Sequence, residues 1–64
     1  MVKINGENVP EEGKTVAEYL AEKGYDGSPV AVELNLAILP KTEYDQTVLK
    51  EGDVLEIVRF VGGG

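Results

Sequence analysis

Hydrophobic and polar residues alternate at the start of the chain, and this alternation predicts a strand. Residues 2–5 have the two-residue period of a strand with one buried face. Asn5-Gly6 follows, and this pair favours a tight hairpin turn because both residues tolerate positive φ. Residues 7–9 then return as a second strand, which Pro10 ends because proline has no amide hydrogen for a strand ladder.

The period changes to three and four residues between Thr15 and Gly24, which predicts a helix. Thr15 and Glu18 have the spacing of a capping box, in which each residue's side chain bonds to the other's backbone. Gly24 suits the position just past the helix, where left-handed geometry is favoured. The helix spans roughly two to three turns. It presents one stripe to bury, formed by Val16, Tyr19, Leu20 and, at its margin, Lys23.

Strand patterns return in the second half of the chain. Residues 30–34 alternate, with Val30, Val32 and Leu34 inward. Asn35-Leu36 predicts a turn into a short extended piece at residues 37–39. Residues 40–44, which begin with proline, predict a single helical turn.

The last third of the chain predicts two more strands. Residues 47–49 form a short one, and residues 54–61 form the final one after a turn at residues 51–53. Leu55 and Ile57 take the inward positions of the final strand, matching the inward positions of the other strands.

Two hairpin strands, a helix and further strands predict an α+β fold. We expect a mixed sheet of four to five strands, with one main helix packed on one face and a short helical turn near residues 40–44. Ala31, Val58 and Phe60 fall on the opposite face. No second helix is predicted to cover that face.

Length and charge narrow the classes of function. The chain has 64 residues, enough for one domain at most, and we expect residues 1–61 to form it and residues 62–64 to form a flexible glycine tail. The net charge of −6 argues against binding to nucleic acid or to an anionic membrane surface. An acidic domain suits a basic patch on a protein partner, although the charge also simply favours solubility.

Several kinds of site are excluded by composition. The chain has no Cys and no His, which rules out disulfides, thiolate nucleophiles, histidine bases and the usual zinc sites. No apolar run is long enough to cross a bilayer, and residues 1–5 lack the apolar core of a signal peptide. We therefore expect a complete, cytoplasmic chain that is a monomer when free.

The polar residues of the chain predict structural roles. Glu11-Glu12 are expected to be solvated in a loop, and Asp53 is expected to bond to the backbone of its own turn. Thr15 is interpreted as a helix cap and not as a nucleophile. We predict no catalytic residue and no metal site in the chain itself.

The glycine tail is the remaining candidate for chemistry. Glycines in general often mark a frayed terminus or a cloning remnant, but here they follow an apolar strand directly and end at a carboxylate. Three extended glycines span about 10 Å and have no Cβ, so they fit a narrow channel in another protein. We predict that Gly64 delivers its carboxylate to a partner's active site and that Gly62 and Gly63 give it access.

The chain resembles the sulfur carrier protein of thiamine biosynthesis, the ThiS family, over essentially its whole length. The resemblance is carried by Asn5-Gly6, the Thr15-capped helix, the segment from residue 30 to residue 44, the block at residues 51–58, and residues 60–64. It implies the ubiquitin-like β-grasp fold. Leu36-Ala37 departs from the family, in which a more polar turn is expected.

The resemblance also implies a chemistry and a set of partners. An E1-like adenylyltransferase would adenylate the Gly64 carboxylate with ATP and magnesium. A persulfide, formed from cysteine by a desulfurase, would convert it to a thiocarboxylate, and thiazole synthase would take the sulfur. The chain itself would be no enzyme and would bind no cofactor. Val58, Phe60 and Ala31 would form an apolar docking patch, unless Phe60 tucks into the edge of the domain.

Three other functions remain open from the sequence. The small subunit of molybdopterin synthase shares the fold, the diglycine end and the activation chemistry, but that family tends to be longer. A plain β-grasp interaction module would carry the glycines incidentally. A ubiquitin-like modifier would instead join its terminal carboxylate to lysines of other proteins.

Overall fold

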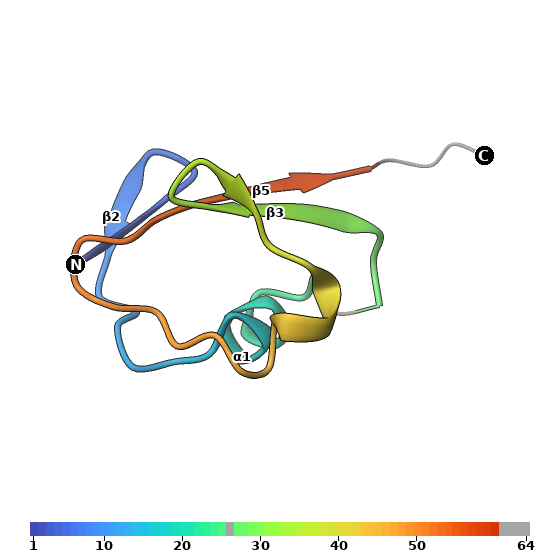
Figure 1. The fold of residues 1–64 in the computed structure, drawn as a ribbon, viewed down its shortest axis with the longest axis horizontal. Coiled ribbons are helices and arrows are strands. Elements are labelled where there is room, and N and C mark those ends of the chain that lie inside the picture. Colours follow the sequence, from blue (N-terminus) through green and yellow to red (C-terminus); the bar gives the residue numbers. More distant parts are fainter. Residues whose placement is uncertain (26, 61–64) are drawn as a thin grey trace.

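The alternating segments of the chain assemble into one mixed sheet. The computed structural model describes residues 1–25 and 27–60. Its strands are β1 (Val2–Ile4), β2 (Glu7–Val9), β3 (Val30–Leu34), β4 (Ala37–Ile38) and β5 (Val54–Arg59). They lie in the order β2-β1-β5-β3-β4 (Figure 1), with β1 parallel to β5 and every other pair antiparallel. The mixed sheet predicted from the sequence is confirmed, with five strands.

Helix α1 (Val16–Glu22) lies on one face of this sheet, which we call the inner face (Figure 1). The capping box is present: the Glu18 amide donates to Thr15 Oγ1 at 3.0 Å, and the Thr15 amide donates to Glu18 Oε1 at 2.8 Å. Lys23 ends the helix as an exposed residue and lies outside its buried stripe. The core is formed by Val2, Ile4, Val16, Tyr19, Leu20, Val32, Leu49, Leu55 and Ile57.

The two hairpin turns of the sheet use left-handed residues, which the sequence predicted at Asn5-Gly6, whereas at residues 35–36 it predicted only a turn. Asn5 has φ 49° and Asn35 has φ 52°. Both side chains also bond to β5: Asn5 Oδ1 accepts from the Ile57 amide at 2.8 Å, and Asn35 Oδ1 accepts from the Val54 amide at 2.9 Å. Each asparagine therefore shapes a turn and holds the central strand.

The segment after β4 differs in part from the prediction. A 3₁₀ helix, η1 (Lys41–Glu43), confirms the predicted helical turn. The strand predicted at residues 47–49 is wrong, because only Val48 forms a bridge, and its partner is Thr15. The Leu49 amide donates to the Lys14 carbonyl at 2.8 Å, and the Leu49 side chain is buried. The apolar residues at 47–49 therefore reflect the burial of Leu49 next to the loop before α1. They do not indicate a strand of the sheet.

The loop before α1 also corrects the expectation for Glu11. Its carboxylate is only 12% exposed and pairs with Lys14 Nζ at 2.7 Å. Lys14 Nζ also lies 2.6 Å from a carboxylate oxygen of Glu22. Asp53 behaves as predicted, since its carboxylate accepts from the Lys50 amide at 2.9 Å. No helix in the described part of the chain is both long and apolar enough to cross a membrane.

The asparagine contacts to β5 predict a graded loss of stability. Asn5→Ala removes the partly buried bond to the Ile57 amide and places a Cβ-bearing residue without local bonding at positive φ. We expect the free energy of unfolding to fall by about 2 kcal/mol. Urea denaturation followed by circular dichroism measures this change.

Asn5→Gly separates the two causes, because glycine tolerates the positive φ but cannot make the bond. It should lose only about 1 kcal/mol. Equal stability of Asn5→Gly and the unaltered protein would show that the bond to Ile57 contributes nothing.

The departure at Leu36 predicts a stabilising substitution. Leu36 has φ 72° and is 92% exposed. Its backbone is therefore strained, and its side chain does not pack against the core. Leu36→Gly should raise the free energy of unfolding by about 1 kcal/mol. Thermal unfolding measures it, with Leu36→Ala as the control that keeps the strained φ. A gain of the same size in Leu36→Ala would show that relief of backbone strain is not the cause.

Candidate functional site

The predicted docking residues lie together on the face of the sheet away from α1, which we call the outer face. Ala31 and Val58 are directly paired across β3 and β5. Their neighbours in the next row, Val32 and Ile57, are buried in the core, so Ala31 and Val58 point outward. Val58 is 55% exposed and Phe60 is 56% exposed. The alternative in which Phe60 tucks into the domain edge is therefore wrong.

The last described residues of β5 are held by the loop that precedes β3. The Phe60 amide donates to the Pro29 carbonyl at 3.0 Å. The Arg59 guanidinium lies 4.5 Å from the centre of the Tyr25 ring and donates to the Gly24 carbonyl at 3.3 Å. These contacts fix the direction in which β5 leaves the domain, on the side opposite the N-terminus (Figure 1).

Val61 and the glycine tail lie outside the described residues. The predicted roles of Gly64 as the sulfur-carrying residue and of Gly62 and Gly63 as its access therefore stay predictions. The described structure ends at Phe60, which belongs to the exposed apolar patch formed by Ala31, Val58 and Phe60. The last described residue is thus both anchored and part of that patch.

Glu33, Ile38 and Glu56 also lie on the outer face near this patch. They were not selected from the sequence as candidate site residues. Glu33 lies directly opposite Glu56 across β3 and β5, and Ile38 lies opposite Glu33 across β3 and β4. Ile38 is 79% exposed. Strand periodicity places Glu33 and Glu56 on one face, but only the register between strands shows that they face each other.

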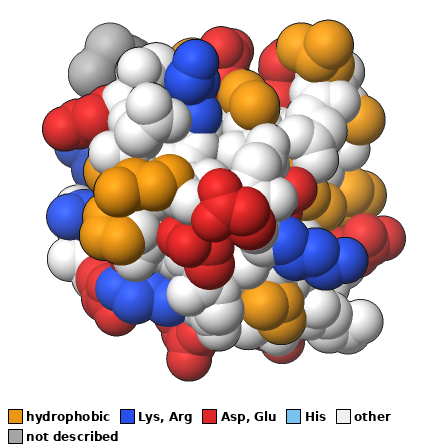
Figure 2. All heavy atoms as spheres, turned by 90° about the vertical axis from the view of Figure 1, so that its left-hand side faces the viewer, with side chains coloured by type: hydrophobic (Ala, Val, Ile, Leu, Met, Phe, Trp, Pro, Cys, Tyr) orange, Lys and Arg blue, Asp and Glu red, His pale blue; other side chains and the backbone are white. Residues whose placement is uncertain are grey.

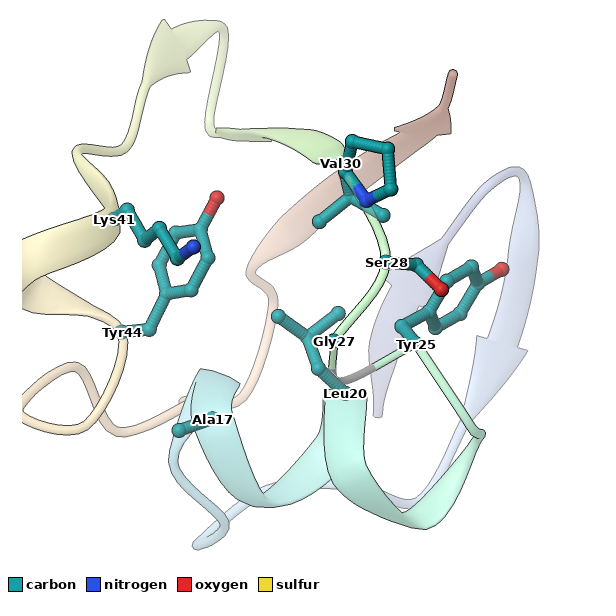
Figure 3. Close-up of a pocket in the computed structure, with 9 residues that line it drawn as sticks. Ala17, Leu20, Tyr25, Gly27, Ser28, Val30, Lys41 and Tyr44 are labelled. Atoms are coloured by element: carbon teal, nitrogen blue, oxygen red, sulfur yellow. The ribbon is translucent and has the colours of Figure 1, made fainter. Parts of the chain in front are cut away.

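A cavity of about 230 Å³ opens on the other side of the sheet, between α1, η1 and the start of β3. Figure 3 shows Leu20 and Ala17 of α1 on its floor, Lys41 and Tyr44 on one wall, and Tyr25, Ser28 and Val30 on the other. Its lining is mainly apolar. No group of three or more Asp, Glu, Cys or His side chains is placed to hold a metal ion within residues 1–25 and 27–60.

Shifted pKa values occur away from the patch. Hydrogen bonding to Glu51 raises the pKa of the Met1 amino group, and hydrogen bonding to Glu11 raises the pKa of the Lys14 ammonium. Burial raises the pKa of the Tyr19 phenol. At the end of the molecule opposite the end of β5, acidic side chains gather near the middle and hydrophobic side chains form separate groups (Figure 2). None of these groups belongs to β3 or β5, and neither does Glu12, whose pKa is lowered by a backbone hydrogen bond.

Comparison with known proteins gives matches along the whole chain. The ThiS family model matches residues 1–64. The sulfur carrier protein ThiS of Thermus thermophilus is 44% identical over 64 residues, which cover 100% of both chains. The crystal structure of the thiamine biosynthesis protein ThiS from Geobacter metallireducens superposes with a TM-score of 0.76 at 34% identity, covering 98% of this chain and 97% of that one.

A second kind of relative contains a matching segment within a longer protein. The thiazole synthase of Paramagnetospirillum magneticum is 50% identical over 62 residues, which are 95% of this chain but only 19% of that protein. This chain therefore spans about a fifth of that relative's length. The matches to full-length carriers and to the solved structure confirm the ubiquitin-like β-grasp fold. Over its whole length, residues 1–64, the chain belongs to the ThiS family.

Proposed function

We propose that this chain carries sulfur as a thiocarboxylate on Gly64 and supplies it for thiazole formation in thiamine biosynthesis. The observation that carries this proposal is the end-to-end match to proteins named as sulfur carriers, among them those of Thermus thermophilus and Bacillus subtilis. The matching segments within two proteins named thiazole synthase support thiazole synthase as the sulfur acceptor.

The chemistry proposed at Gly64 begins with a poor electrophile. A carboxylate resists attack by sulfur, so an E1-like adenylyltransferase first joins it to the adenylyl group of ATP, with magnesium, and releases pyrophosphate. The terminal sulfur of a persulfide, supplied through a cysteine desulfurase, then attacks the acyl carbon and AMP leaves. A second thiol cleaves the remaining sulfur–sulfur bond and frees the thiocarboxylate. The catalytic groups, ATP and magnesium belong to the partners, which act with the carrier in the cytoplasm.

The described residues of the carrier serve to present the tail. Val58 and Phe60 offer a partner an apolar surface within four residues of Gly62, the first residue of the tail. Arg59 and Phe60 are bonded to the loop before β3, so a partner that binds the patch meets a fixed exit direction. Docking on a rigid strand end lowers the cost of orienting the residues that follow.

The central prediction is a change of mass at the C-terminus. Incubation with the adenylyltransferase, ATP, magnesium, a cysteine desulfurase and cysteine should exchange one oxygen of the protein for sulfur. Intact-protein mass spectrometry, followed by fragmentation, should place the sulfur on Gly64. A variant lacking Gly63 and Gly64 should keep its fold and show no exchange.

Other products would contradict the proposal. Continued ATP–pyrophosphate exchange by the shortened variant would show that the glycines are incidental. Conjugates that survive denaturing purification would indicate a ubiquitin-like modifier. Restoration of molybdoenzyme activity by the gene, with no sulfur transfer to thiazole synthase, would identify the chain as the small subunit of molybdopterin synthase.

The docking patch predicts a kinetic effect without a loss of stability. Phe60→Ala removes an exposed aromatic side chain, so the free energy of unfolding should change by less than about 0.5 kcal/mol. The KM for the carrier in ATP–pyrophosphate exchange should rise about tenfold, the effect of losing one aromatic anchor. Val48→Ala is the matched control, because Val48 is also exposed but lies outside the sheet. Equal KM values for the two variants would exclude Phe60 from docking.

A further inference from the structure

The outer face of the sheet holds two like charges in direct opposition. The register of β3 and β5 pairs Glu33 with Glu56, and both residues are exposed. Directly opposed side chains of antiparallel strands have Cβ atoms about 5 Å apart, and like charges there are destabilising. Neither carboxylate forms an ion pair within residues 1–25 and 27–60. Lys3, on the neighbouring strand, is paired with Val54 and forms no ion pair with another described residue.

Exposed apolar side chains surround this pair of carboxylates. Val58 follows Glu56 on the outer face of β5, Ile38 lies beside Glu33, and Val54 precedes Glu56. Their exposed fractions are 55%, 79% and 38%. No helix of the described residues covers this face (Figure 1). A partner that covers the apolar side chains must therefore also remove water from the two carboxylates.

Charge complementarity selects the chemistry of that partner. Covering two carboxylates without a cation is costly, since buried charge requires a counter-charge and hydrogen bonds. A guanidinium fits better than an ammonium, because its planar fork of donors can bond to two carboxylates at once and its weak hydration suits an apolar surround. A second copy of this chain would bring two more carboxylates into the same place, so self-association is opposed by charge.

We propose that the outer face docks a protein surface that presents an arginine, seated between Glu33 and Glu56, within a ring of apolar side chains that meet Val58 and Ile38. We assign this surface to the adenylating partner, so the inference rests on the proposed function and refines its docking step. The repulsion between the carboxylates in the free chain is relieved when the guanidinium arrives. The pair thus weakens the fold slightly and strengthens recognition.

The test compares stability and docking in the same variants. Glu33→Gln, Glu56→Gln and the double variant should raise the urea midpoint of unfolding, because each removes the repulsion. The double variant should raise the KM for the carrier in adenylation about tenfold at unchanged kcat. The KM of the unaltered carrier should also rise more steeply with sodium chloride than that of the double variant. Glu43→Gln, on η1, removes one carboxylate away from the outer face, as each single variant does on it, and should leave KM unaltered.

Each other outcome overturns the inference in a distinguishable way. If the double variant has the KM of Glu43→Gln while thiocarboxylate still forms, the arginine contact is wrong and the proposed function stands. If the unaltered carrier is never adenylated, both fail. If sedimentation shows a dimer that the double variant strengthens, the outer face joins two copies of the chain and not an arginine-bearing partner.

Discussion

The fold depends on hydrogen-bond partners for the backbone of β5 on both of its edges. β3 pairs with β5 along most of its length, but β1 is only three residues long and its pairing ends at Leu55. The Ile57 amide would then lie partly buried without a partner, at a cost typical of an unmade hydrogen bond. Asn5 supplies the missing acceptor from the turn that follows β1. Asn5 thereby continues the hydrogen bonding to β5 beyond the point where β1 ends.

Alternate residues of β5 lie on opposite faces of the sheet, and the two faces have different roles. Leu55 and Ile57 enter the core against α1, where burial of apolar surface stabilises the domain. Glu56 and Val58 point outward, where they contribute little to stability and are free to meet other proteins. Because a strand separates its faces strictly by parity, recognition can change without disturbing the core.

The sequence indicated local structure well, because its signals act over a few residues. The capping box of Thr15 and Glu18, the Asn5-Gly6 turn and the inward positions of β5 all follow from spacing. Contacts between distant segments were not predictable in the same way. The Leu49 contact with the loop before α1 and the opposition of Glu33 and Glu56 each depend on how separate elements meet.

The parallel pairing of β1 with β5 has a mechanical consequence. A pull on the chain beyond Phe60 would apply force along β5. Hydrogen bonds of a sheet run across its strands, so a lengthwise pull loads the bonds to β1 and β3 together instead of opening them one at a time. The contacts of Arg59 with Gly24 and Tyr25 add to the attachment of the end of β5. The pairing of β5 on both sides therefore lets a small domain resist a pull applied along this strand.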